Sequence, residues 1–361
     1  MIRPLYQTIV GTGGLGVGTV FKSQDMHTLG RNESRLAELT ESRDYCKLHI
    51  VFHYLAKMLT PHVRVVGVSK VGKDEYGAHC LTMMEGAGVE TDFIATSKSS
   101  PTMRSMCLLY PDNSGCNVTS SNSACNEVTP EYIEQCMKAL GDAGNMVIVA
   151  LPEVPFASRK AMLELGKQCG AFCAATVPTA DAKRFLTEDC MALCDLLAIN
   201  IDEASALCGV NAFDSMDDAR LCAEMLTTQY PWMKLWITLG KMGSVTASDG
   251  EIYWQEALPV SVIASTAGAG DAGLAGILIG LALGLPFHKQ HQDAFWCETP
   301  LASAVELGIM FSGISIESPD SIVEGFDWET LGQYISCKGL HMEKRFQNMM
   351  ASYLNRMDMR L

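Results

Sequence analysis

The sequence STAGAGD, residues 265–271, decides the fold and runs directly into an apolar segment that continues to residue 285. Upstream, residues 252–264 carry β-branched and aromatic side chains, which predicts a strand. Downstream, leucine and isoleucine recur three and four residues apart from Leu274 to Leu281, which predicts a helix. The glycines are therefore expected to form a turn at the N-terminus of a helix.

Such a turn is suited to binding an anion. Glycine lets the backbone approach a ligand closely, and the first N–H groups of a helix, at the positive end of its dipole, attract phosphate. We therefore predict an anion hole formed by the backbone amides of Gly268, Ala269 and Gly270. Beside it, the carboxylate of Asp271 could take a proton from an attacking hydroxyl as a general base. The alternative is that Asp271 only caps the helix and that the glycines only serve packing.

The composition indicates a compact globular protein without affinity for nucleic acid. The chain of 361 residues is 48% hydrophobic and 19% charged, and this length suits one large α/β domain or two smaller ones. With 27 basic and 41 acidic residues, the formal net charge is −14. There is no basic excess to neutralise a phosphate backbone, although a local basic cleft remains open.

Cysteine usage and hydropathy predict a cytoplasmic protein that is not bound to a membrane. The 14 cysteines are scattered and show no paired C-x-x-C pattern, so we expect reduced, mostly buried thiols. The first residues lack a basic region followed by a long apolar one, so we expect no signal peptide. The longest uncharged run, at 272–287, is sixteen residues and contains glycine, which favours a core helix over a membrane span.

Strand-like and helix-like segments alternate along most of the chain. This order predicts an α/β fold with a doubly wound parallel sheet flanked by helices. A loosely alternating segment at 101–110, a turn sequence PDNSG at 111–115 and a short segment at 116–119 predict a separate hairpin. The other expected strands are 8–10, 63–68, 145–150, 171–177, 194–199 and 235–239, and the expected helices are 45–59, 78–86 and 156–169.

The N-terminal glycines match a dinucleotide pattern in part. Residues 11–16 read G-x-G-x-x-G after a short strand, which would fit a nicotinamide oxidoreductase. That reading requires a helix to open on the glycines, but residues 17–25 show no helical periodicity. We keep it as an alternative of a different class.

Four short motifs occur in a fixed order. They are VGKDEYG at 71–77, NIDE at 200–203, TLGKMG at 238–243 and GAGD at 268–271. Together they resemble the signature of the ribokinase-like (PfkB) family of carbohydrate and nucleoside kinases, over about residues 5–320. The resemblance implies a kinase domain at 1–320 with a small β-sheet lid from about 12–44 and 97–120, followed by a C-terminal helical extension at 321–361.

The activity that the resemblance implies is ATP-dependent phosphorylation of a hydroxyl on a sugar or sugar-like acceptor. Asp271 would be the general base, and the amides of residues 268–270 would form the anion hole. The expected partners are a small-molecule substrate and a second copy of the chain, as a homodimer through the lid. A nucleoside kinase, or a non-catalytic relative that binds a sugar or a nucleotide, remains open.

The resemblance also assigns the nucleotide and metal residues. Asn200 and Glu203 would organise Mg²⁺ and its waters, which fits an ion that takes few protein carboxylates. The same residues also fit a helix start with acidic side chains in its first turn. For ATP, the family pattern implicates Thr238, Gly240, Gly243 and Ser303. Lys241 would lie near a phosphate or point to solvent.

The chain departs from the family in two places. Where members carry G-G-x-x-x-N before the first long helix, this chain has RDYCKLH at 43–49, so we expect a rebuilt substrate pocket. Ser265 stands where members carry an Asp near a monovalent cation, which places a K⁺ requirement in doubt. The candidate substrate-binding residues are Gly13, Gly14, Asp44, Lys47, His49 and Asp271. His49 and His53, four residues apart, also fit ordinary core or surface positions.

Overall fold

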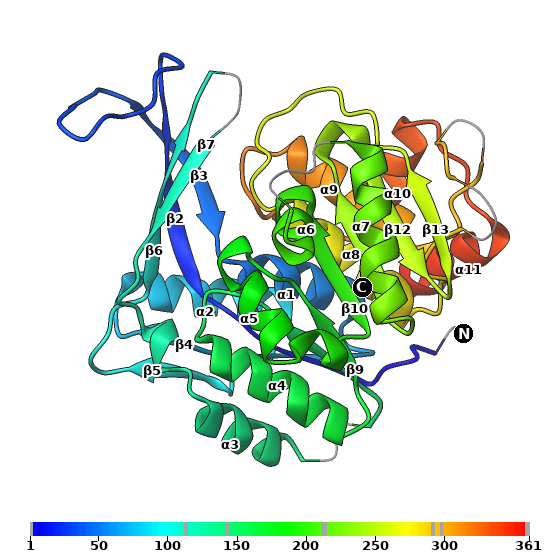
Figure 1. Ribbon diagram of the computed structural model, residues 1–361, viewed down its shortest axis with the longest axis horizontal. Coiled ribbons are helices and arrows are strands. Elements are labelled where there is room, and N and C mark those ends of the chain that lie inside the picture. The colour runs from blue at the N-terminus through cyan, green and yellow to red at the C-terminus, as the bar shows by residue number, and fades with distance from the viewer. Residues whose placement is uncertain are drawn as a thin grey trace.

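The computed structural model describes residues 3–111, 115–141, 144–210, 215–289, 293–296 and 299–357. These residues form a nine-stranded sheet covered by helices on both faces and a separate four-stranded sheet that stands beside it (Figure 1). The predicted α/β architecture with a small additional sheet is therefore confirmed. The turn predicted at 111–115 lies largely outside the described residues, although the strands on either side of it pair as expected.

The large sheet has the order β13-β12-β11-β10-β9-β8-β1-β4-β5. All its neighbouring strands pair in parallel except the β11–β12 and β12–β13 pairs, which are antiparallel. The strands are β1 Thr8–Thr12, β4 Arg64–Gly72, β5 Ile94–Ser97, β8 Met146–Ala150, β9 Phe172–Ala175, β10 Leu196–Asn200, β11 Lys234–Thr238, β12 Ser244–Ser248 and β13 Glu251–Gln255. From β1 the chain winds outward through β4 and β5, then returns to β8 on the other side of β1. Ligands of open α/β sheets bind where the strand order reverses, so this topology points to the carboxyl ends of β1 and β8.

Two hydrophobic clusters cover the two faces of the large sheet. One contains side chains from α1, α2 and α8–α11, and the other contains side chains from α3–α7. The helices are α1 Lys47–Leu59, α2 Glu75–Ala87, α3 Pro130–Leu140, α4 Phe156–Gln168, α5 Ala182–Thr187, α6 Ile201–Cys208, α7 Met216–Gln229, α8 Ala269–Ala282, α9 Ala304–Ile316, α10 Trp328–Cys337 and α11 Lys344–Met357. The last two helices thus pack into the same core as the rest of the chain.

The glycine-rich helix α8 packs tightly against α9. A Cβ on Gly276 would lie 2.7 Å from the Cα of Gly308, and one on Gly308 would lie 2.7 Å from the carbonyl oxygen of Gly273. Nearly every residue of α8 is buried, which explains why the segment is apolar all round rather than amphipathic. The close packing holds the N-terminus of α8, where the GAGD sequence lies, in a rigid frame.

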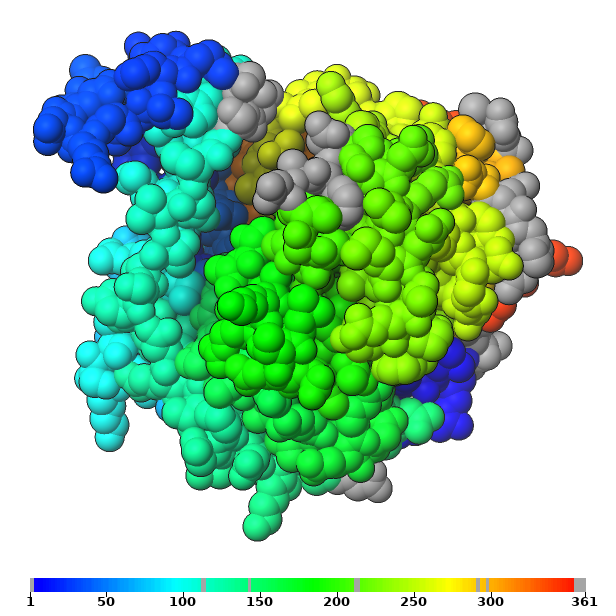
Figure 2. Space-filling model, in the orientation of Figure 1, coloured from blue at the N-terminus to red at the C-terminus, as the bar shows by residue number. Residues whose placement is uncertain are grey.

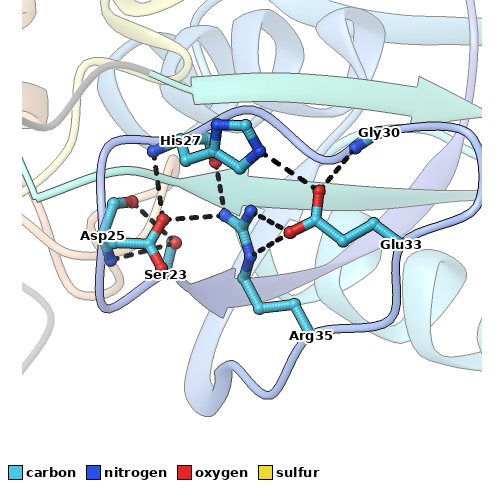
Figure 3. Close-up of polar contacts among 6 residues, drawn as sticks. All are labelled: Ser23, Asp25, His27, Gly30, Glu33 and Arg35. Atoms are coloured by element: carbon cyan, nitrogen blue, oxygen red, sulfur yellow. Dashed lines mark hydrogen bonds and ion pairs between the residues drawn. The ribbon is translucent and has the colours of Figure 1, made fainter.

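The small sheet, which we call the lid sheet, has the order β3-β2-β6-β7. Its strands are β2 Gly16–Lys22, β3 Glu38–Tyr45, β6 Met103–Leu109 and β7 Gly115–Thr119. Residues 23–37 connect β2 to β3 in a long loop at one end of the sheet (Figure 1). Within the loop, Arg35 pairs with Glu33 and lies 2.9 Å from Asp25, while Glu33 accepts a hydrogen bond from the amide of Gly30 at 2.9 Å (Figure 3). These contacts between residues of the exposed loop stabilise its conformation.

Two sequence-based expectations differ from the structure near the glycines. The strand expected at 252–264 ends at Gln255, and residues 256–268 form a loop that reaches α8. This loop is tied to the end of α9, because the amides of Ala264 and Ser265 both donate to the carbonyl of Ile316. At the other glycine stretch, the chain after β1 continues into β2 and not into a helix. The dinucleotide fingerprint is therefore not formed.

Candidate active site

The GAGD sequence forms the start of α8. Gly268 is the N-cap in the left-handed region with φ of 77°, and Ser321 packs directly on it, so that a side chain there would be both strained and crowded. Gly270 is exposed, and a Cβ on it would meet no atom within 4 Å. The first turn of α8 therefore faces open space, as an anion hole requires.

Asp271 lies in this first turn with only 7% of its surface exposed. The ammonium of Lys47, from the start of α1, contacts both carboxylate oxygens, at 3.1 Å and 3.3 Å. Asp271 is the main reason that the pKa of Lys47 is raised, with the carboxylates of Glu153 and Glu203 adding to it. The Asp271 side chain thus bonds to a lysine of another helix, whereas a capping side chain bonds to a backbone amide of its own helix.

Glu153 lies at the point where the strand order reverses, and the sequence motifs did not single it out. It follows β8 with an unusual positive φ of 73°, and its Oε2 accepts a hydrogen bond from the backbone amide of Lys47 at 3.1 Å. A Cβ on Gly14, after β1, would lie 2.7 Å from that same Oε2. Gly14 thus leaves room for the carboxylate, and burial raises the pKa of Glu153 to about 7. A strained backbone carrying a buried carboxylate is typical of a functional position.

Asn200 and Glu203 are brought together at the end of β10. They form a capping box at the start of α6, in which Asn200 Oδ1 accepts from the amide of Glu203 and Glu203 Oε2 accepts from the amide of Asn200, both at 2.9 Å. Burial raises the pKa of Glu203, and the charge of Asp271 raises it further. The helix-cap reading is therefore correct, but it does not account for a partly buried acid that interacts electrostatically with Asp271.

The donor set around Glu203 fits Mg²⁺ bound mainly through water and phosphate. Capping occupies one carboxylate oxygen, and Oε1 of Glu203 remains available to a metal-bound water. Within the described residues, no group of three or more His, Cys, Asp or Glu side chains could hold a metal by itself. Mg²⁺ typically takes one or two carboxylates and completes its shell with water and substrate phosphates, so one carboxylate here is sufficient.

The TLGKMG residues lie beside Asn200 at the same edge of the sheet. Thr238 ends β11 directly opposite Asn200 in the β10–β11 register. Gly240 is exposed with φ of 57°, and Gly243 has φ of 91° with the carbonyl of Gln255 packed against it. Lys241 is exposed and forms no ion pair with another described residue. Gly240 and Lys241 therefore form an exposed edge after β11.

Asp44 reaches the site from the lid sheet. Its Oδ2 accepts from the thiol of Cys107 at 3.3 Å and lies 3.5 Å from the amide nitrogen of Asn117. Burial is the largest cause of the raised pKa of Asp44, and the charge of Asp271 also raises it. Asp44 therefore interacts electrostatically with Asp271. Figure 2 shows a hollow between the lid sheet and the body of the molecule.

Two predicted site residues lie elsewhere. His49 is fully buried, its ring packs 4.6 Å from that of Tyr45 and 6.3 Å from that of His53, and neither of its nitrogens has a partner among the described residues. Burial lowers the pKa of His49 to about 3, so it is a neutral core residue. Ser303 caps α9 at the end that packs on Gly280, at the opposite end of α8 from Asp271. Neither residue is brought to the site.

Gly13 and Ser265 occupy supporting positions. A Cβ on Gly13 would lie 2.8 Å from the Cβ of Leu151, so this glycine lets the ends of β1 and β8 pack closely. Ser265 is buried, and its hydroxyl accepts a hydrogen bond from the amide of Ala267 at 3.2 Å. Ser265 thus shapes the loop that leads into the anion-binding turn.

Comparison with known proteins places this site in a family. The family model described as pfkB family carbohydrate kinase matches residues 51–323. The chain belongs to the pfkB family of carbohydrate kinases. It is therefore a kinase, and use of ATP follows from the family. The match covers the sheet from α1 to the loop after α9, with the Asn200, Thr238 and Asp271 segments inside it.

Solved structures of pfkB-type kinases share the fold over almost the whole chain. Ribokinase from Giardia lamblia superposes with a TM-score of 0.73 at 16% identity, covering 92% of this chain and 99% of that one. Ribokinase from Cryptococcus neoformans var. grubii in complex with ADP gives 0.68 at 17% identity, with coverage of 91% and 99%. Burkholderia thailandensis nucleoside kinase in complex with inosine gives 0.67 at 16% identity, with coverage of 92% and 99%. At these identities the likeness establishes the fold and not the acceptor.

No curated protein matches the sequence of this kinase. Among the described residues, no helix is both long enough and apolar enough to cross a bilayer.

Proposed function

We propose that this pfkB-family kinase transfers the γ-phosphoryl group of ATP to a hydroxyl of a sugar or sugar-like acceptor, with Asp271 as the general base. One observation carries the proposal. Asp271, in the first turn of α8, contacts Lys47, and the Lys47 backbone in turn binds Glu153 at the reversal of strand order. The N-terminus of α8, the proposed base Asp271 and the carboxyl group of Glu153 thus lie together at the carboxyl edge of the sheet. This is where α/β sheets bind their ligands.

In this mechanism the acceptor hydroxyl approaches Asp271 from the side of Glu153. The carboxylate of Asp271 takes the proton from the hydroxyl as its oxygen bonds to the γ-phosphorus, while the bond from that phosphorus to the ADP oxygen breaks. The backbone amides of residues 268–270 face the phosphoryl oxygens and stabilise the charge on them. Lys47 keeps Asp271 ionised and oriented before the acceptor arrives.

The nucleotide lies, in this proposal, along the carboxyl ends of β10 and β11. Thr238, Gly240 and Gly243 border the open space there, and Asn200 and Glu203 hold the waters of Mg²⁺. Bound Mg²⁺ would neutralise phosphate charge. Support for this placement comes from the partly buried Glu203, whose pKa is raised mainly by burial and also by the charge of Asp271. Ser303 has no part in this arrangement because of its position at the far end of α8.

The lid sheet supports two finer proposals. Its outer face exposes apolar side chains, including Leu39 at 62% and Val118 at 64%, which would suit contact with the lid of a second copy in a homodimer. The inner face would close over the acceptor and exclude water, which limits wasteful hydrolysis of ATP. We also propose that the protein acts in the cytoplasm, because all cysteines of the described residues are free thiols.

A direct assay tests the proposed function. The purified protein is incubated with ATP, Mg²⁺ and single acceptors from a panel of sugars, amino sugars, sugar acids and nucleosides, with and without K⁺, and both ADP and the phosphorylated acceptor are measured. We expect stoichiometric ADP and phosphorylated acceptor for at least one sugar-like compound. With Ser265 in place of the family's Asp, we expect K⁺ to change the rate by less than about twofold. Phosphorylation of nucleosides alone would support the nucleoside-kinase alternative. ATP binding without turnover on any acceptor would favour a non-catalytic binding protein.

A further inference from the structure

The acceptor side of the site carries more negative charge than positive. Lys47 interacts electrostatically with Asp271, Glu153 and Glu203, and Asp271 in turn acts on Asp44. Among the described residues, Lys47 forms an ion pair only with Asp271. Glu203 has a partner in Mg²⁺ under the proposed function, so Asp44 and Glu153 are left facing the acceptor without a cation.

The environment of Asp44 offers hydrogen-bond donors but no cation. Its Oδ2 lies 3.3 Å from the thiol of Cys107 and 3.5 Å from the side-chain amide of Asn117, and it forms no ion pair within the described part of the chain. Hydrogen bonds from the Ser321 hydroxyl and the Tyr45 amide also lower the pKa of Asp44, but burial raises it by more. The neighbouring cation, Arg43, is exposed on the opposite face of β3, because successive side chains of a strand alternate. A half-buried carboxylate with such partners is incompletely compensated and favours a ligand that supplies a strong donor or a positive charge.

The part of the inner lid face beside Asp44 is mostly polar, and none of its described residues is aromatic. Strand alternation and the pairing register place Gly18, Val20, Ser105, Cys107, Asn117 and Thr119 on the same face as Asp44. Met103, at one end of this face, and Lys22 and Leu109, at the other, belong to it as well. A face of hydroxyl, thiol and amide groups suits a polyhydroxylated molecule, whereas a nucleobase would require an apolar or aromatic surface to stack on.

Gly18 preserves the position of Asp44. A Cβ on Gly18 would lie 3.0 Å from the Cβ of Asp44 and would crowd Ser105 as well. The backbone amides on either side of Asp44 are tied to the body, since that of Arg43 donates to Asp320 at 2.8 Å and that of Tyr45 to Ser321 at 3.0 Å. Asp44 therefore has a defined place at the base of the lid and does not move freely with its tip.

We propose that Asp44 makes the acceptor site selective for an amino sugar, whose ammonium group pairs with the Asp44 carboxylate while a hydroxyl is presented to Asp271. This inference rests on the proposed function and specifies its acceptor. A neutral sugar binds through hydrogen bonds alone and is a poorer substrate. A sugar acid brings a third negative charge next to Asp44 and Glu153 and is rejected.

The test compares matched acceptors on one carbon skeleton. Glucosamine, glucose and glucuronate, and the corresponding galacto and manno sets, are assayed with ATP and Mg²⁺ for kcat/KM in the wild type and in Asp44→Asn. We expect at least one amino sugar to exceed its neutral counterpart about tenfold or more, and the acids to show no turnover. In Asp44→Asn this preference should fall at least tenfold, because kcat/KM for the amino sugar should fall by more than kcat/KM for the neutral sugar.

Two further variants make the outcome specific to Asp44. Glu41→Gln removes the same charge from an exposed position of β3 and should leave the preference unchanged. Asn117→Asp adds a carboxylate beside Asp44 and should increase the preference for the amino sugar, which gives a readout even if Asp44→Asn folds poorly. The inference is overturned if the wild type phosphorylates neutral sugars or sugar acids as well as amino sugars, or better, and if Asp44→Asn keeps the same order of acceptors. The kinase function would not be affected by that result. Absence of turnover on every acceptor contradicts the proposed function instead.

Discussion

The ion pair between Lys47 and Asp271 predicts a measurable coupling energy. At 3.1 Å, two unit charges attract by roughly 5 kcal/mol at an effective dielectric constant of about 20. The cost of removing both charges from water offsets much of this attraction. Because 35% of the Lys47 side chain is still exposed, solvent also screens the pair. We therefore expect a net coupling energy of about 2 kcal/mol. Lys47→Met removes the charge and retains the backbone amide that donates to Glu153. Lys47→Met should lower the free energy of unfolding by more than Lys47→Met combined with Asp271→Asn does. The single variant leaves the Asp271 charge unpaired, whereas the double variant leaves no unpaired charge.

The assay is a double-mutant cycle read by thermal unfolding. With about 2.1 cal/mol/K of unfolding entropy per residue, a chain of 361 residues shifts its Tm by roughly 1.3 °C per kcal/mol, so the coupling should amount to about 3 °C. A control cycle uses the exposed pair of Arg64 and Glu90, 2.7 Å apart with side chains 46% and 36% exposed. That pair should couple by less than about 1 °C. Additive Tm shifts for Lys47 and Asp271 would refute the argument that the two charges support each other in the folded site.

Two further variants test the carboxylates around this pair. The pKa of Glu153 is raised to about 7, so the folded protein holds a proton there that the unfolded chain releases near its ordinary value. The stability that this proton contributes is present below about pH 4.5 and is lost as pH rises through about 7. Glu153→Gln should therefore have a Tm that rises relative to wild type between pH 5 and pH 8, and parallel Tm curves would contradict the assignment. Glu203→Gln keeps an oxygen for the capping box and should fold normally, but it should need about ten times more Mg²⁺ for half-maximal rate. An unchanged Mg²⁺ titration would remove Glu203 from the metal site.

Much of the fold could be predicted from local sequence. The buried strands and helices carry strong periodic patterns, and their order specifies a parallel sheet. The strand expected at 252–264 was wrong beyond Gln255, because the β-branched residues that follow belong to a loop anchored on α9. Only the tertiary hydrogen bonds to Ile316 distinguish that loop from a strand.

The site was predictable where its residues form contiguous motifs. Asp271, Asn200 and Glu203 lie at helix starts that the sequence marks clearly. Glu153 was not singled out, because its importance depends on β8 returning to lie beside β1, a long-range pairing that no local pattern encodes. The available signal in the sequence was an acidic residue, Glu153, three positions after the end of the apolar strand β8.

The two misplaced residues have simple geometric explanations. His49 lies on the buried side of α1. The helical periodicity of the sequence does not distinguish a histidine in the core from one that faces a ligand. Ser303 does begin a helix as expected, but α9 runs antiparallel to α8, and the nine helical steps from Ser303 to Ser312 span about 14 Å. It is Ser312 that reaches the functional end, where its hydroxyl donates to the carbonyl of Ala269 at 2.8 Å.

The most direct measurement of the central claim compares turnover and ATP binding in Asp271→Asn and Asp202→Asn. Both variants remove one negative charge from the first turn of a helix at the same edge of the sheet, but Asp202 is exposed and contacts no residue of the proposed acceptor site. The account predicts that Asp271→Asn lowers kcat by about 10²-fold or more while its affinity for ATP stays within about threefold, and that Asp202→Asn retains both. Turnover by Asp271→Asn comparable to that of the wild type would contradict the assignment of Asp271 as the base.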